Sequence, residues 1–231
     1  MKRSTPHDAP DAEVTLSAPA RDFVARAKRR LSQTPPDKLD VAVSLAELAS
    51  QYGDHRMAAE IATVLADKPF RAAAVLVPVV ARERPAFLLT QRSSDLSSHS
   101  GQIAFPGGRI DEDDADPAAA AVRESEEEIG LARKFVSPLG YLDPYLSGTG
   151  FRIVPVVALV APGFSLALNP HEVADAFEVP LDFLMSPDNH ARHSREWKGV
   201  MRSYYAIPYG ERYIWGVTAG IIHRLYERLY A

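Results

Sequence analysis

The stretch that decides the fold is GGRIDEDDADPAAAAVRESEEEIGL, residues 107–131. Two glycines and a run of acidic residues precede a segment that begins with Asp116 and Pro117 and ends at Gly130. Aspartate is a favoured N-cap, proline is tolerated in the first helical turn, and glycine is typical of the left-handed position after a helix. We therefore predict a helix over residues 117–129, with a loop on each side.

Helical spacing divides this segment into two faces. Small or apolar side chains share one stripe, which predicts close packing against the rest of the protein: Ala118, Ala121, Val122, Ser125 and Ile129. The carboxylates of Glu124, Glu127 and Glu128 follow i, i+3, i+4 spacing and share a second face, whereas Glu126 points to solvent. Arg123 precedes Glu127 by one turn, and we expect these two residues to pair.

Three carboxylates on one helix face repel one another unless a cation lies among them. Oxygen ligands on a rigid element suit Mg²⁺ or Mn²⁺, with water and substrate phosphates completing the coordination. The acidic face therefore predicts a divalent-metal site, although an acidic helix with one ion pair on its surface would show the same three glutamates.

The segments around this helix predict a mixed sheet and few long helices. Apolar, β-rich runs at 71–80 and 86–93 flank ARERP, residues 81–85, and predict a hairpin. Further strands are expected within 101–108, 151–161 and 175–184, and on both sides of a turn at 208–211. Helices are expected at 20–31, 41–50, 56–66 and 219–230, the last of them capped by Thr218. The fold class is α+β, an α/β/α sandwich.

The order of these segments predicts three regions. Residues 1–18 are polar and contain proline, and they form a flexible tail. Residues 19–66 form an N-terminal helical extension, which either covers the domain or contributes to a homodimer contact. Residues 67–231 form the domain that carries the site.

Composition excludes several classes of function. A net charge of −4 over 231 residues gives no field that would attract nucleic acid or an anionic membrane. The absence of cysteine excludes disulfides, thiolate nucleophiles and Cys-ligated zinc. No apolar run approaches the roughly 20 residues of a membrane helix, and the first residues lack the apolar core of a secretory signal. We expect a cytoplasmic protein that acts on a small molecule.

The second half of the quoted stretch resembles the Nudix box, G-x5-E-x7-R-E-U-x-E-E-x-G-U, where U is a bulky aliphatic residue. Six residues match this pattern: Arg123, Glu124, Glu127, Glu128, Gly130 and Leu131. Ser125 stands where the box has an aliphatic residue. Ala115 stands where the box has its early glutamate, and Asp114 is the nearest acid. A loop that is longer by one residue and carries aspartate is similar to the coenzyme A pyrophosphatase branch of this superfamily.

A second motif, LLTQRSSDLSSHSGQIAFPGG at residues 88–108, points to the same branch. It is similar to the branch pattern L-L-T-x-R-S-x3-R-x3-G-x3-F-P-G-G. The matching residues are Leu88, Leu89, Thr90, Arg92, Ser93, Gly101, Phe105, Pro106, Gly107 and Gly108. Ser97 replaces the second arginine, and this departure bears on substrate preference.

The resemblance implies a Nudix fold and metal-dependent hydrolysis of coenzyme A or a derivative to 4′-phosphopantetheine and adenosine 3′,5′-bisphosphate. It implies Glu124, Glu127 and Glu128 as ligands of Mg²⁺ or Mn²⁺, with Arg123 holding Glu127. Arg92 and Ser93 are the expected substrate-binding residues, and Gly107 and Gly108 bring backbone close to metal or phosphate. An acid outside the box often acts as ligand or base in this superfamily; Glu172 is the candidate, ahead of Glu178 and Asp175.

Three other interpretations remain open at this point. A Nudix pyrophosphatase of different specificity would act on ADP-ribose, a dinucleotide or a nucleoside triphosphate. A Nudix-fold binding module would have lost catalysis, but it would have no need to keep three mutually repelling acids. A purely structural acidic protein would require both motifs to be accidental.

Overall fold

The computed structural model describes residues 15–36, 71–96, 99–147, 149–197 and 200–231. Its helices are α1 (Ala18–Arg30), α4 (Pro117–Ile129), α5 (Leu181–Leu184) and α6 (Val217–Tyr230), with 3-10 turns at Arg133–Phe135 and Pro187–Asn189. Its strands are β1 (Arg71–Val80), β2 (Ala86–Arg92), β3 (Ile103–Ala104), β4 (Gly107–Arg109), β5 (Val136–Tyr141), β6 (Tyr145–Leu146), β7 (Phe151–Val160), β8 (Val173–Pro180), β9 (Ala191–Trp197), β10 (Val200–Tyr209) and β11 (Arg212–Trp215). The predicted helices at 41–50 and 56–66, and most of the predicted tail, lie outside the described residues.

Strand β1 organises the main sheet. It runs parallel to β7 along its whole length, from Arg71 opposite Phe151 to Val80 opposite Val160. Its other edge is shared: the end of β1 pairs with β2, as the predicted hairpin requires, and its start pairs with β4. Strands β3 and β8 extend the sheet beyond β2, and β5 and β6 pair with β7. The sheet is therefore mixed, and β2 and β4 diverge beside β1.

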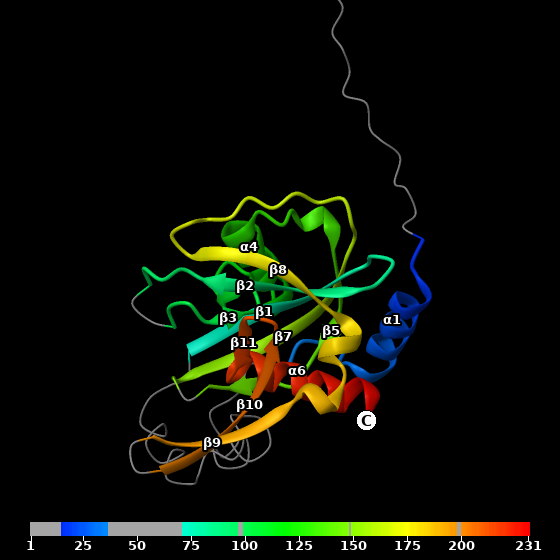
Figure 1. Ribbon diagram of the computed structural model, residues 1–231. Helices are drawn as coiled ribbons and strands as arrows, with labels where there is room; N and C mark the ends of the chain where they lie inside the picture. Colours follow the sequence, from blue (N-terminus) through cyan, green and yellow to red (C-terminus); the bar gives the residue numbers. More distant parts are fainter. Residues whose placement is uncertain (1–14, 37–70, 97–98, 148, 198–199) are drawn as a thin grey trace, which may run out of the picture.

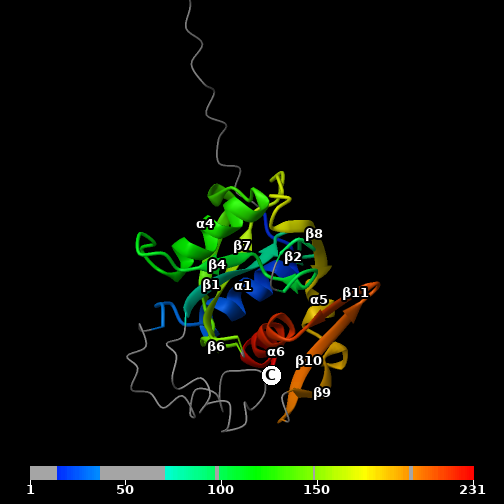
Figure 2. The same cartoon turned by 90° about the vertical axis from the view of Figure 1, so that its left-hand side faces the viewer.

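Helices cover both faces of this sheet (Figures 1 and 2). Helix α4 packs on one face through a core cluster that includes Ala120, Ala121 and Ile129. Helices α1 and α6 pack on the other face, where Phe23 and Leu225 join a second core cluster. This arrangement confirms the predicted α/β/α sandwich. A separate three-stranded sheet, β11–β10–β9, lies beside α6.

The central helix has the predicted bounds and caps. The side chain of Asp116 accepts a hydrogen bond from the Ala119 N–H at 2.8 Å, and Pro117 occupies the first turn. Gly130 adopts φ 68°, in the left-handed region that favours glycine. Ala167 packs against Gly130 so closely that an added Cβ would lie 2.8 Å from its backbone nitrogen. The end of α4 therefore depends on glycine for both conformation and space.

Two expectations about other elements were wrong, and one strand was not expected. The segment 101–108 contains two strands, because Pro106 separates β3 from β4. Helix α6 begins at Val217 after Gly216, and Thr218 lies inside it, where its hydroxyl donates to the Ile103 carbonyl at 2.9 Å. Strand β9 was not predicted, because its mostly polar, exposed residues lack apolar alternation.

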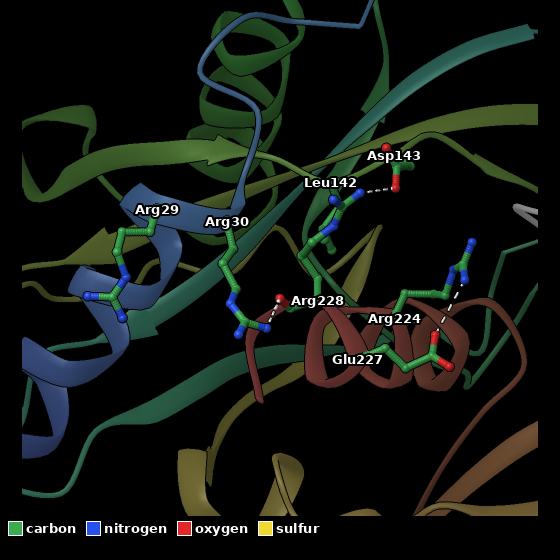
Figure 3. A pocket seen from close by; sticks show the side chains of 7 residues that line it. All are labelled: Arg29, Arg30, Leu142, Asp143, Arg224, Glu227 and Arg228. Carbon is green, nitrogen blue, oxygen red and sulfur yellow. Dashed lines mark hydrogen bonds and ion pairs between the residues drawn. The ribbon is translucent and has the colours of Figure 1, made fainter. Parts of the chain in front are cut away.

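Helices α1 and α6 border a hollow of about 580 Å³ on the face opposite α4 (Figure 3). Its charged side chains largely bind one another: Arg228 donates to Asp143, and Arg224 to Glu227 at 3.3 Å. Arg30 donates to the carbonyl of Ala231 at 2.9 Å. The hollow therefore lies between α1 and α6, apart from the predicted acidic site. No helix among the described residues is long and apolar enough to span a membrane.

Replacement of Gly130 tests how α4 ends. Gly210 also has a positive φ, 58°, but an added Cβ there would meet open space. We expect Gly210→Ala to lower the free energy of unfolding by about 1 kcal/mol, through backbone strain alone. Gly130→Ala should cost at least about 1 kcal/mol more, because Ala167 must also move. Equal losses in urea denaturation of the two variants would show that the contact with Ala167 is unimportant.

Candidate active site

Glu128 is the buried carboxylate of the candidate site. It lies two turns after Ala121 on the same face of α4, and only 4% of the residue is exposed. Its Oε2 accepts a hydrogen bond from the Gly107 N–H at 3.0 Å, and its Oε1 lies 3.8 Å from Nη1 of Arg92. Glu128 and Glu124 thus lie on the same side of α4, against β4, and this side is buried at Glu128.

Burial changes the proton affinity of this carboxyl. Loss of hydration raises the pKa of Glu128 to about 7, since a charged carboxylate is disfavoured away from water. The Gly107 N–H and the charge of Arg92 oppose this rise, whereas the charges of Glu124 and Glu172 add to it. The site thus holds more negative charge than its own cations neutralise.

Glu124 lies one turn earlier and is half-buried. Burial raises the pKa of Glu124, and hydrogen bonding to Arg123 partly opposes the rise. Its carboxylate lies directly against Gly108, where any Cβ would overlap it. Gly107 has φ 148°, and a Cβ there would overlap the Ala74 carbonyl oxygen of β1. The two glycines of β4 thus let α4 bring its carboxylates against this strand.

Arg123 is the centre of the ion-pair network beside these carboxylates. Its guanidinium binds both carboxylate oxygens of Asp114, at 3.0 and 2.9 Å, and contacts Glu124 and Glu127 at 3.1 Å each. It also donates to the Arg109 carbonyl. The hydrogen bonds from Arg123 hold the pKa of Asp114 below its usual range. The contact between Arg123 and Asp114 fixes the loop before α4, and our sequence analysis did not predict it although it singled out Asp114.

Glu127 does not join the other two glutamates. Its side chain is 59% exposed and pairs with Arg123, as predicted. Glu126 pairs with Arg133 at 3.0 Å. In the part of the chain that the structure describes, no three His, Asp or Glu side chains form a group that could hold a metal ion. The predicted cluster of three helix carboxylates is therefore not assembled in this conformation, because Arg123 draws Glu127 toward solvent.

Glu172 contributes a third negative charge near Glu124 and Glu128. Its charge raises the pKa of both residues. The Asn169 N–H donates to the backbone carbonyl of Glu128 at 2.9 Å, and the Asn169 side chain donates to Glu172 Oε1 at 3.2 Å. The Glu172 carbonyl in turn accepts the Ser93 N–H at 2.8 Å. Hydrogen bonds thus link the loop before β8 both to α4 and to the end of β2.

The other candidate residues lie in different surroundings. Asp175 and Glu178 bind Arg212 and Arg82, each at 2.6 Å, so both already have a cationic partner. Ser93 is buried, and its hydroxyl accepts the Asp95 N–H at 3.3 Å. Ser97 lies outside the described residues. Glu172 is therefore the acid near α4 that the loop geometry favours.

Carboxylate oxygens are the ligands that a hard dication prefers. Glu124 and Glu128 lie against Gly108 and Gly107 of β4, and the charge of Glu172 acts on both. In this conformation they do not form a complete set of ligands, but the chemistry of the two helix carboxylates fits a divalent cation that would also bind a polyanionic substrate.

Comparison with known proteins identifies the family. The model of the NUDIX domain matches residues 69–198, more than half of the chain. A Photorhabdus laumondii protein named "Uncharacterized Nudix hydrolase NudL" is 43% identical over 159 residues, covering 69% of this chain and 85% of that protein. A protein of the same name from Citrobacter koseri is 42% identical, covering 67% and 81%. The NUDIX domain of Shewanella oneidensis NrtR, solved with ADP ribose, aligns with a TM-score of 0.46 and 17% identity, covering 70% and 90%.

These matches show that the chain belongs to the Nudix family, as the box at 107–131 predicted. It is a Nudix hydrolase, an enzyme of the class that hydrolyses phosphoric anhydrides. Divalent metals are the general cofactors of this class.

The raised pKa of Glu128 predicts how stability depends on pH. The folded protein holds this proton up to about pH 7, whereas the unfolded chain releases it near 4.5. Stability from this group is therefore complete below pH 4.5 and is lost as pH rises through 7, by about 3 kcal/mol at most. In metal-free buffer, Glu128→Gln should match the parent protein near pH 4.5 and be more stable above pH 7. Urea curves that differ by the same amount at every pH would contradict this assignment.

Proposed function

We propose that this Nudix hydrolase cleaves the diphosphate of coenzyme A or its derivatives, giving 4′-phosphopantetheine and adenosine 3′,5′-bisphosphate. The observation that carries the proposal is the meeting of two motifs. Arg92, Ser93 and Gly107, from the stretch 88–108, contact Glu128 or the Glu172 loop that touches it. A substrate held by the first motif would therefore lie against the carboxylates of the second.

Glu124, Glu127 and Glu128 are the proposed ligands of Mg²⁺ or Mn²⁺. Glu127 would join the other two when its exposed side chain leaves Arg123, since rotation of this side chain requires no change in α4. A bound dication supplies neutralisation of the diphosphate and a more acidic water. Burial of the carboxylates strengthens this binding, because their charges are poorly screened by solvent.

The chain's own residues position the reactants. Arg92 presents its guanidinium to a phosphate oxygen, which planar donors bind well. Glu172 accepts a proton from the attacking water, since its carboxylate stands opposite α4 and is held by Asn169. The water oxygen bonds to one phosphorus as the bridging P–O bond breaks, and the displaced phosphate leaves with that bonding pair. No covalent enzyme intermediate is required, consistent with a chain that lacks cysteine.

Substitution of single glutamates on α4 tests the proposed site. Glu124→Gln and Glu128→Gln should each lower kcat by at least about 100-fold, because an amide neither neutralises metal charge nor replaces a carboxylate ligand. Glu126→Gln is the matched control on the same helix, since Glu126 pairs with Arg133 and should leave kcat unchanged. Steady-state assays with Mg²⁺ would measure these effects, and equal losses in all three variants would argue against the assignment.

A substrate panel tests the proposed specificity. Coenzyme A, acetyl-coenzyme A, ADP-ribose, NADH and a nucleoside triphosphate would be incubated with enzyme and Mg²⁺ or Mn²⁺, and products resolved by mass. We expect adenosine 3′,5′-bisphosphate from coenzyme A. If coenzyme A is not cleaved but another diphosphate is, the protein is a Nudix pyrophosphatase of different specificity. Ser97, which stands in place of the motif arginine, would then mark the changed specificity. We further propose that the enzyme is cytoplasmic, and that the N-terminal extension either covers the domain or contributes to a homodimer contact.

A further inference from the structure

The guanidinium of Arg92 makes few contacts with the protein, although it lies beside the buried carboxylate of Glu128. It ends β2, and the strand register shifts between Gln91 and Arg92, which redirects its side chain. The side chain is 28% exposed, and its Nη1 lies 3.8 Å from Glu128 Oε1. Its Nε is buried and has no hydrogen-bond partner among the described residues. A buried donor without a partner is costly, so this conformation leaves binding capacity unused.

The neighbouring arginine shows what a firmly bound guanidinium looks like in this protein. Arg123 binds Asp114 through two nitrogens at 3.0 and 2.9 Å, the bidentate geometry that arginine and carboxylate prefer. Arg92 has one long contact with Glu128 instead. The contact nevertheless matters for charge, because Arg92 is a cation that favours the ionised form of Glu128.

We propose that Arg92 is the counter-ion of Glu128 in the metal-free enzyme, and that it exchanges this carboxylate for a substrate phosphate when metal binds. The proposal rests on the function proposed above. In the metal-free enzyme Arg92 competes with the metal for Glu128, and in the metal-bound enzyme it binds the substrate phosphate. Replacement of Arg92 should therefore strengthen metal binding and weaken phosphate binding.

The competition follows from how the oxygens of Glu128 are used. Oε2 accepts the Gly107 N–H, so Oε1 is the oxygen that faces Arg92. With a dication held by the same carboxylate, the Arg92 guanidinium would be repelled and would turn away, and its Nε and Nη donors would become available. These donors lie on a planar fork that matches two phosphate oxygens. Metal binding thus prepares the substrate contact.

The first arm of the test is Mn²⁺ affinity, measured from the electron paramagnetic resonance signal of free Mn²⁺ without substrate. Arg92→Gln removes the competing charge and should tighten Mn²⁺ binding by about fivefold or more. Measurement at about pH 9 limits competition from protons at Glu128. Arg92→Lys is the matched control that keeps a positive charge, and it should bind Mn²⁺ as the parent enzyme does. Unchanged or weaker Mn²⁺ binding by Arg92→Gln would overturn the exchange.

The second arm measures binding of methylenediphosphonate, a diphosphate analogue that cannot be hydrolysed, by calorimetry. With saturating Mn²⁺, Arg92→Gln should weaken this binding by about tenfold. Without Mn²⁺, parent and variant should differ by less than about twofold, because Arg92 is then engaged with Glu128. A similar loss with and without Mn²⁺ would show that Arg92 binds phosphate independently of the metal and would overturn the proposal.

The outcomes separate this proposal from the function on which it rests. Failure of the parent enzyme to bind Mn²⁺ would overturn both. If the parent enzyme binds Mn²⁺ and cleaves coenzyme A, but Arg92→Gln neither tightens Mn²⁺ binding nor weakens diphosphate binding, only the exchange by Arg92 is overturned.

Discussion

The candidate site depends on the burial of the Glu128 carboxylate where α4 meets β4. A buried carboxylate is unfavourable unless other groups compensate for its lost hydration. The Gly107 N–H supplies one hydrogen bond and Arg92 a distant charge, yet the pKa of Glu128 still rises to about 7. The protein thus holds a buried carboxyl that its own residues neutralise incompletely, and a bound dication would favour its ionised form.

The surrounding architecture keeps this arrangement rigid. Strand β1 pairs with β2 near one end and with β4 near the other, so the two motif-bearing segments diverge beside it. Arg123 fixes the loop before α4 through Asp114, and Asn169 fixes the loop before β8 to the carbonyl of Glu128. Ser125, where the Nudix box has an aliphatic residue, is fully buried and satisfies its hydroxyl at the Ala121 carbonyl. The departure from the box is therefore accommodated within the helix.

Local sequence patterns predicted the elements that local chemistry determines. The bounds of α4 followed from Asp116, Pro117 and Gly130, and the hairpin followed from two apolar runs around ARERP. The surroundings of Glu128 did not follow, because they depend on a contact between distant segments: its carboxylate accepts the N–H of Gly107, 21 residues earlier. The pair of Arg123 and Glu127 is local, and it did follow from the i, i+4 spacing.

Contacts between segments far apart in the sequence also explain the errors near the end of the chain. Thr218 resembles a helix cap in sequence, but β3 offers it the Ile103 carbonyl, 115 residues away. Strand β9 forms by pairing with β10, and its polar residues carry no periodic pattern that would indicate a strand.

A carbon-13 NMR titration of the glutamate carboxyl groups in metal-free protein, with Glu128→Gln used to assign the resonance, tests whether Glu128 is a buried and incompletely neutralised carboxyl. We expect one carboxyl that titrates near pH 7 and loses this transition when a diamagnetic dication such as Mg²⁺ is added. Titration of every glutamate near its ordinary pKa, with no response to the metal, would contradict the buried, incompletely neutralised carboxylate on which the site depends.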